Sequence, residues 1–217
     1  MFIVIEGCDC TGKSSQVERL RQKIQSAGHI CVSHSFPNYT SNTGHLIRQY
    51  LDGKISLGNG LLLDGKNADP FIFQSLQTID RYAVAGAIEA QLTLGWDVVC
   101  GRWWQSSYAY GRYDGLDSAW LKQISSHLPT ADINILIDLD PDEARKRNDG
   151  REGDPDRYER DLVRQRKVRE LYLSLWKGAC GSEPLSGFWT IVDGMGTADE
   201  VHDRMMDSHW WLQRIRT

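Results

Sequence analysis

Five short runs rich in apolar and β-branched residues recur along the chain, separated by longer amphipathic stretches. The first covers Phe2 to Glu6, and the others cover residues 30–36, 97–101, 133–139 and 188–193. Such runs predict strands buried on both faces. Because they alternate with helical segments, the chain is predicted to form an α/β fold of three layers, with a five-stranded parallel sheet flanked by helices.

Helical periodicity is clearest after Pro70. Apolar residues recur there at spacings of three and four, namely Ile72, Leu76, Ile79, Ala83, Ala87, Ala90 and Leu94. This spacing predicts a long helix with that stripe facing the core, while Phe73, Gln77 and Arg81 share another face. Further helices are predicted over residues 14–27 and 43–52, and the glycine-rich residues 52–69 predict a loop.

Between the first strand and the first helix, residues 7–14 match the phosphate-binding pattern G-x-x-x-x-G-K-[ST]. Glycines allow backbone N–H groups to surround phosphate oxygens, Lys13 can reach the β- and γ-phosphates, and the Ser14 hydroxyl can ligate Mg²⁺. We therefore predict a P-loop NTPase-type fold that binds a nucleoside triphosphate. The predicted nucleotide-binding residues are Gly7, Cys8, Asp9, Cys10, Thr11, Gly12, Lys13, Ser14 and Ser15.

The length and composition of the chain are sufficient to bury a good core. With 217 residues, 41% of them hydrophobic, the chain is predicted to form one domain over residues 1–217. A net charge of −4 argues against general binding to nucleic acids or membrane surfaces. No stretch approaches the roughly 18 apolar residues of a membrane span, and the N-terminus lacks the features of a signal peptide. A cytoplasmic location is the expectation.

The five cysteines show no Cys/His spacing of a zinc site. Cys8 and Cys10 could form a redox pair, but small side chains are also tolerated within a phosphate loop. The second interpretation is favoured.

Residues 148–155 are polar and rich in helix breakers, and they follow a predicted helix that carries Arg145 and Arg147. The pattern predicts a mobile segment, which could be an ordinary solvated turn. In a phosphate-loop protein it could instead deliver cations when the site closes and excludes water.

Several motifs together resemble those of thymidylate kinases and their close relatives among nucleoside monophosphate kinases. They are residues 2–7 with Asp9, residues 12–16, Phe36-Pro37, Arg81, Gly101-Arg102-Trp103 with residues 106–111, and residues 156–159. The resemblance spans most of the chain. It implies transfer of the γ-phosphoryl group of ATP to a deoxynucleoside monophosphate (dTMP or a related, modified one), with Mg²⁺, a short lid at about residues 145–157 and a homodimer.

The resemblance also implies roles for single residues. Asp9 would meet the 3′-hydroxyl group of the sugar, Arg102 the acceptor phosphate and Arg81 the base edge. Cys10 stands where animal members have a catalytic arginine, so that charge would come from the lid. The implied catalytic residues are Lys13, Arg102, Arg147, Arg151 and Asp9, with Arg145 a weaker candidate. The implied substrate-binding residues are Asp9, Phe36, Pro37, Gln77, Arg81, Arg102, Trp103, Ser106 and Tyr110.

Two departures from the family pattern stand out. Gly101 replaces an aspartate expected near the metal, and Gln77 replaces a phenylalanine that stacks on the pyrimidine. A carboxamide offers a donor and an acceptor side by side, so Gln77 could read a base or could simply be solvated. Aromatic residues that could supply another stacking surface, or pack in the core, are Trp103, Trp104, Tyr108 and Tyr110.

Two other functions compete with this one. A deoxynucleoside kinase needs a carboxylate base to accept a hydroxyl proton, and in proteins of that kind it would stand at the place of Gly101. A nucleotide-binding protein without turnover would explain the missing aspartate, but the intact Lys13, Ser14 and Arg102 argue against it. Trp210 and Trp211 could belong to a dimer interface or to the core.

Overall fold

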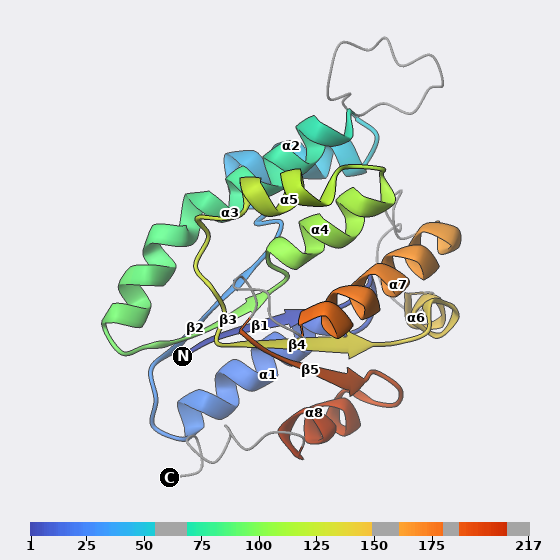
Figure 1. Cartoon of the computed structure of the whole chain (residues 1–217). Coiled ribbons are helices and arrows are strands. Elements are labelled where there is room, and N and C mark those ends of the chain that lie inside the picture. Colours follow the sequence, from blue (N-terminus) through green and yellow to red (C-terminus); the bar gives the residue numbers. More distant parts are fainter. Residues whose placement is uncertain (55–68, 149–160, 180–186, 208–217) are drawn as a thin grey trace.

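The computed structural model describes residues 1–54, 69–148, 161–179 and 187–207, and a parallel sheet forms its centre (Figure 1). The strands are β1 (Phe2–Glu6), β2 (Cys31–Ser35), β3 (Asp97–Gly101), β4 (Ile133–Asp138) and β5 (Phe188–Asp193). Their order across the sheet is β2-β3-β1-β4-β5, and every pairing is parallel. The predicted α/β fold is therefore confirmed, and the predicted strand bounds are correct to within one residue.

The central strand β1 determines where the candidate site lies. It pairs with β3 through Ile3 and Val99 and with β4 through Ile3 and Ile133. Because the strands are parallel, the segments that follow β1 and β3 leave the same edge of the sheet. This carboxyl edge is where open α/β sheets bind ligands.

Helices cover both faces of the sheet (Figure 1). One face carries α1 (Lys13–Ser26) and α8 (Ala198–Asp207), and the other carries α3 (Pro70–Thr93), α4 (Trp104–Tyr113) and α7 (Leu162–Ala179). The shorter helices are α2 (Asn42–Leu51), α5 (Ser118–Ile124) and α6 (Pro141–Asn148).

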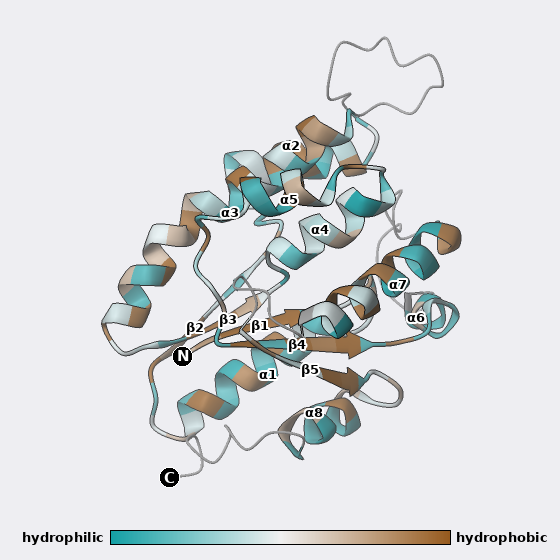
Figure 2. Cartoon of the chain, in the orientation of Figure 1, coloured by the Kyte–Doolittle hydropathy of each residue, from teal (hydrophilic) through white to brown (hydrophobic). Residues whose placement is uncertain are grey.

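The two faces of β1 lie in two different apolar clusters, as the alternation of side chains along a strand requires. Ile3 and Ile5 pack in the cluster that contains residues of α1 and α8, whereas Phe2 and Val4 pack in the cluster that contains residues of α3 and α4. Figure 2 shows that β1, β4 and β5 are mainly hydrophobic and lie between helices of mixed character. The central strand is thus buried on both sides, as its uninterrupted apolar sequence predicts.

The prediction for the core face of α3 is wrong except at Leu76, which is partly buried against the apolar cluster that contains Phe73. Ile72, Ile79 and Leu94 are 39%, 52% and 68% exposed, and Ala83, Ala87 and Ala90 of the same stripe are also exposed. The buried face instead carries Phe73, Gln74, Thr78, Asp80, Arg81, Ala85 and Ile88. The inner face of α3 borders a polar cavity as well as the core, so apolar periodicity identified the wrong side.

Candidate active site

The phosphate loop joins β1 to α1 and depends on two glycines. A Cβ atom on Gly7 would lie 2.6 Å from the carbonyl oxygen of Ile137 and 2.9 Å from Thr11 Oγ1, so a larger residue does not fit there. Gly12 caps α1 in the left-handed conformation, with φ of 89°. The first turn of α1 then presents Ser14 and Ser15 as exposed residues. This is the arrangement that leaves backbone N–H groups open to phosphate.

Lys13 lies buried against the inside of the loop. Its Nζ donates hydrogen bonds to the carbonyl oxygen of Cys8 and, over 3.4 Å, to Thr11 Oγ1. Burial, followed by the positive charge of Arg102, lowers the pKa of Lys13 to about 8. An anionic phosphate would both replace the carbonyl contact and favour the charged ammonium.

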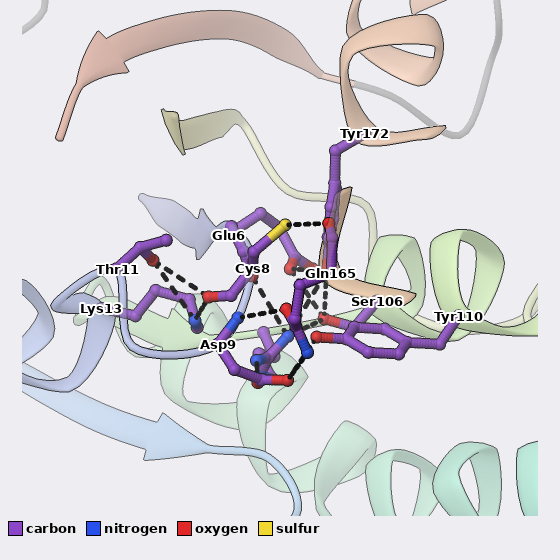
Figure 3. A network of polar contacts seen from close by, with 11 residues as sticks. Glu6, Cys8, Asp9, Thr11, Lys13, Ser106, Tyr110, Gln165 and Tyr172 are labelled. Carbon is purple, nitrogen blue, oxygen red and sulfur yellow. Dashed lines mark hydrogen bonds and ion pairs between the residues drawn. The ribbon is translucent and has the colours of Figure 1, made fainter. Parts of the chain in front are cut away.

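Asp9 accepts hydrogen bonds from three side chains that are far apart in the sequence, and Figure 3 labels two of them, Tyr110 and Gln165. Arg102 forms an ion pair with it, Tyr110 donates over 2.7 Å, and Gln165 of α7 donates over 2.6 Å. Burial opposes ionisation of this carboxyl, but the charges of Arg102 and Lys13 and the hydrogen bonds outweigh it, so its pKa lies below the usual value. Asp9 is therefore a fixed anion.

Arg102 is held in a strained backbone conformation at the end of β3. Its φ is 66°, which non-glycine residues adopt only rarely. Its Nη1 donates to the carbonyl oxygen of Gly7 and to Ser106 Oγ, both over 3.2 Å. These contacts keep the guanidinium beside the phosphate loop.

A buried carboxylate lies beneath these residues. Glu6 is fully buried and accepts hydrogen bonds from Trp103 N–H over 2.7 Å, Ser106 Oγ over 2.7 Å and the Tyr172 hydroxyl over 3.0 Å (Figure 3). Sequence reasoning missed Glu6, Tyr172 and Gln165. A charged residue at the end of a buried strand is a signal that could have found Glu6, but no local pattern marks the two residues of α7.

A cavity opens from this network between α3 and α4. Its empty space is about 470 Å³, a volume that includes open solvent at its mouth. The lining residues predicted from the sequence are Asp9, Pro37, Gln77, Arg81, Arg102, Ser106 and Tyr110. The lining residues not predicted are Tyr39, Leu51, Phe73, Gln74 and Ser107.

Two of the predicted substrate-binding residues do not line the cavity. Phe36 and Trp103 are 4% and 0% exposed, with ring centroids 5.2 Å apart, and Trp103 Nε1 donates to the carbonyl oxygen of Pro129. Trp104 and Tyr108 pack against each other with ring centroids 6.2 Å apart. Of the four aromatic residues considered for stacking, Tyr110 alone lines the cavity, while Phe36 and Trp103 support its wall from the core.

The candidate lid arginines occupy different places. Arg147 donates from Nη2 to the carbonyl oxygens of Gly194 and Gly196, each over 2.7 Å, beyond β5. Arg145 is exposed. Arg151 and the rest of the predicted lid from residue 149, like Trp210 and Trp211, lie outside the described residues.

The structure argues against the redox pair that was considered for Cys8 and Cys10. Burial raises the pKa of Cys8 to about 12, which does not suit a reactive redox thiol. Among the residues that the structure describes, no cluster of three or more His, Cys, Asp or Glu could hold a metal, and no helix is long and apolar enough to cross a membrane.

Comparisons with known proteins agree with this geometry. A sequence profile of the thymidylate kinase family matches residues 5–183. The chain is 32% identical over 203 residues to a probable thymidylate kinase from Pyrococcus abyssi, with 93% of this chain and 92% of the relative covered. It is 29% identical to thymidylate kinase from Caenorhabditis elegans, covering 99% and 92%.

A solved thymidylate kinase from Candida albicans has the same fold. It superimposes with a TM-score of 0.77 at 24% identity, and the alignment covers 99% of this chain and 92% of the other.

Proposed function

The chain belongs to the thymidylate kinase family, which phosphorylates dTMP to dTDP with ATP, and we propose that the phosphate loop, the Asp9–Arg102 pair and the cavity between α3 and α4 carry this reaction. The observation that supports the assignment most is the position of Arg102. Its guanidinium contacts both the phosphate loop at Gly7 and the cavity, where donor and acceptor phosphates would meet.

The phosphates of ATP bind to the N–H groups of residues 7–14. Lys13 gives up its contact with the Cys8 carbonyl oxygen and turns to the β- and γ-phosphates. Its charge then neutralises the transferring group. The loop is already shaped for this by Gly7 and Gly12.

The residues present fit a magnesium ion held mainly by the nucleotide. Ser14 exposes its hydroxyl at the first turn of α1, but Gly101 offers no carboxylate, and that of Glu6 is occupied by three donors. Mg²⁺ often keeps several waters and is bound through few protein ligands plus substrate phosphates. When bound, it would neutralise phosphate charge, and Ser14 is the residue that would hold it.

The acceptor nucleotide lies with its phosphate against Arg102 and its sugar near Asp9. Base-edge contacts come from Arg81 and Gln77, which line the cavity. A monophosphate oxygen is already anionic, so the reaction needs positioning and charge neutralisation rather than a strong base. Arg147 and Arg151 supply further positive charge on closure, for which Arg147 must release the carbonyl oxygens of Gly194 and Gly196.

The geometry argues against a deoxynucleoside kinase. That reaction needs a carboxylate with a pKa suited to accept a proton. Asp9 carries three donors and its pKa is lowered, while Gly101 has no side chain.

A coupled assay with ATP, Mg²⁺ and a panel of deoxynucleosides and deoxynucleoside monophosphates tests the assignment. We expect turnover of dTMP and none of thymidine. Turnover of thymidine alone would indicate the deoxynucleoside kinase, and binding of ATP without any turnover would indicate a binding protein.

A homodimer is part of the proposal. The exposed apolar stripe of α3 that includes Ile72, Ile79 and Ala83 has the composition of a surface covered by another molecule. Sedimentation equilibrium of the purified chain tests this, and a monomer at micromolar concentration would contradict it.

A further inference from the structure

One buried side chain of the cavity has polar atoms without partners. Gln74 of α3 is 1% exposed and lines the cavity. Among the residues that the structure describes, neither its amide nitrogen nor its amide oxygen has a hydrogen-bond partner. Buried amides are normally paired, so an unpaired one that lines a binding cavity is suited to hydrogen-bond a bound ligand.

The stem of Gln74 is held firmly even though its amide is not. A Cβ atom on Gly111 of α4 would lie 3.3 Å from Gln74 Cγ, so the glycine permits this close approach between α3 and α4. The Gln74 backbone carbonyl oxygen also accepts a 2.9 Å hydrogen bond from Thr78 Oγ1. An apolar residue of the same length could fill this space without burying an unpaired amide.

A second glutamine at the same site behaves differently. Gln165 donates to Asp9 through Nε2 over 2.6 Å and accepts the Asp9 backbone N–H at Oε1 over 3.2 Å. These two bonds fix which end of that carboxamide is donor and which is acceptor. Within the described part of the chain, no hydrogen bond fixes the carboxamide of Gln74, which can turn through half a rotation about its terminal bond.

In the proposed binding mode, the base is the part of the acceptor nucleotide that would contact Gln74. With phosphate at Arg102 and sugar at Asp9, the base extends into the cavity, whose wall also contains Phe73 and Leu51. Arg81 only donates, and its Nη1 is already bonded to the carbonyl oxygen of Gln77 and to Ser107 Oγ. Its remaining donors suit a carbonyl oxygen of a pyrimidine base.

We propose that Gln74 is the specificity-determining residue that reads N3 and the 4-substituent of the base, and that its freely turning carboxamide accepts both thymine-type and cytosine-type edges. Thymine presents N3–H as donor and O4 as acceptor, and cytosine presents the reverse pair. The predicted substrate class is therefore pyrimidine deoxynucleoside monophosphates in general. This inference rests on the proposed function of the site.

The first test compares dTMP, dUMP and dCMP with the unaltered enzyme. We expect kcat/KM for dCMP to lie within about tenfold of that for dTMP, because either orientation of the amide makes two hydrogen bonds. A dCMP value below a hundredth of the dTMP value would overturn the freely turning amide. Absence of dTMP turnover would instead refute the proposed function itself.

The second test uses Gln74→Met, which keeps length and removes hydrogen bonding, with Gln91→Met as the matched control. Gln91 lies on the same helix but contacts His34 instead of the cavity. We expect Gln74→Met to lower kcat/KM for both dTMP and dCMP by about tenfold to a hundredfold, leaving KM for ATP unchanged. The control variant should leave kcat/KM for dTMP, kcat/KM for dCMP and KM for ATP unchanged.

A stability measurement separates base reading from a structural role. Removing an unpaired buried amide should raise the melting temperature of the ligand-free protein by about 2–4 °C, whereas loss of a structural contact would lower it. Unchanged kinetics, or a lowered melting temperature in both Gln74→Met and Gln74→Leu, would overturn the proposal. Failure of both variants to fold would do the same, because the amide would then be required by the fold.

Discussion

Asp9 and Arg102 form an ion pair that joins the phosphate loop to the residue following β3, across 93 positions of the sequence. Each group also has further partners, so the pair is a fixed part of the site and not a flexible surface contact. An acceptor phosphate approaching Arg102 would share the guanidinium with Asp9.

Arg102→Ala should lower kcat/KM for dTMP more than tenfold. Loss of charge-assisted hydrogen bonds to the acceptor phosphate is worth about 1.5–3 kcal/mol. Steady-state kinetics with varied dTMP measures the effect. Arg112→Ala is the control, since Arg112 lies in α4, the helix that follows Arg102, but does not line the cavity and donates to the carbonyl oxygen of Leu116. Equal kinetics in both variants would place the acceptor elsewhere.

The lowered pKa of Lys13, about 8, predicts a pH limit for ATP binding. In the free enzyme the ammonium is lost above this pH, so kcat/KM for ATP should fall about tenfold per pH unit there. Bound phosphate restores the proton, so kcat should stay level to higher pH. Profiles of both constants between about pH 6.5 and 10 test this.

The predicted loss of activity above pH 8 cannot be explained by deprotonation of Lys13 unfolding the protein. Between pH 8 and its ordinary pKa of 10.5, the unfolded chain holds a proton on this lysine that the folded chain lacks. Stability from this group therefore rises with pH in that window. A kcat/KM for ATP that is unchanged up to about pH 9.5 would contradict the role of Lys13.

Gly101→Asp should reduce the Mg²⁺ concentration needed for half-maximal activity by about fivefold, because the added carboxylate would lie near the proposed site of the metal and the phosphates. A Cβ atom at Gly101 would lie 3.3 Å from both Ser35 Oγ and Val17 Cγ2, so a small adjustment is required. Gly101→Asn carries the same shape without the charge and is the control. The same Mg²⁺ requirement in both variants would show that the ion binds away from this residue.

The sequence predicted the sheet and the phosphate loop because both depend on local patterns. Buried strands and a glycine-rich turn are encoded in consecutive residues, whereas the predicted cavity residues came from the resemblance to a family. The side chains of Gln165 and Tyr172 reach Asp9 and Glu6 over separations of 156 and 166 positions, and no local pattern encodes these contacts.

The error at α3 has a different cause. Periodicity detects an apolar stripe but not what covers it, so Ile79 and Ala83 were predicted to face the core. The inner face has to provide Gln74 and Arg81 to the cavity, and these polar residues weaken its apolar signal.

Arg147→Ala should lower kcat at saturating nucleotide by more than tenfold and change KM for ATP less than threefold. This is the result for a cation that meets the transferring phosphoryl group only after closure. Arg145→Ala, at an exposed position on the same helix, should have little effect. A raised KM with normal kcat would mean that Arg147 only braces the segment at Gly194 and Gly196.

Gln77→Phe should improve kcat/KM for dTMP and narrow the tolerance for other bases. Gln77 lines the cavity one helical turn before Arg81, and its backbone carbonyl oxygen accepts a 2.7 Å hydrogen bond from Arg81. A polar side chain there lets the enzyme contact a polar C5 substituent or a purine, whereas an aromatic ring would stack on the pyrimidine and occupy that space.

The size of the change follows from the contact that is lost. A good hydrogen-bonded contact to the alternative base is worth roughly 1–3 kcal/mol, which is about tenfold to a hundredfold in discrimination. Relative kcat/KM values for dTMP, 5-hydroxymethyl-dUMP and dGMP should shift by that factor toward dTMP in Gln77→Phe. Gln77→Leu removes the amide without adding a ring, so it separates lost hydrogen bonding from gained stacking. If all three enzymes rank the bases alike, Gln77 has no part in base selection, and recognition of the base rests on Gln74 and Arg81.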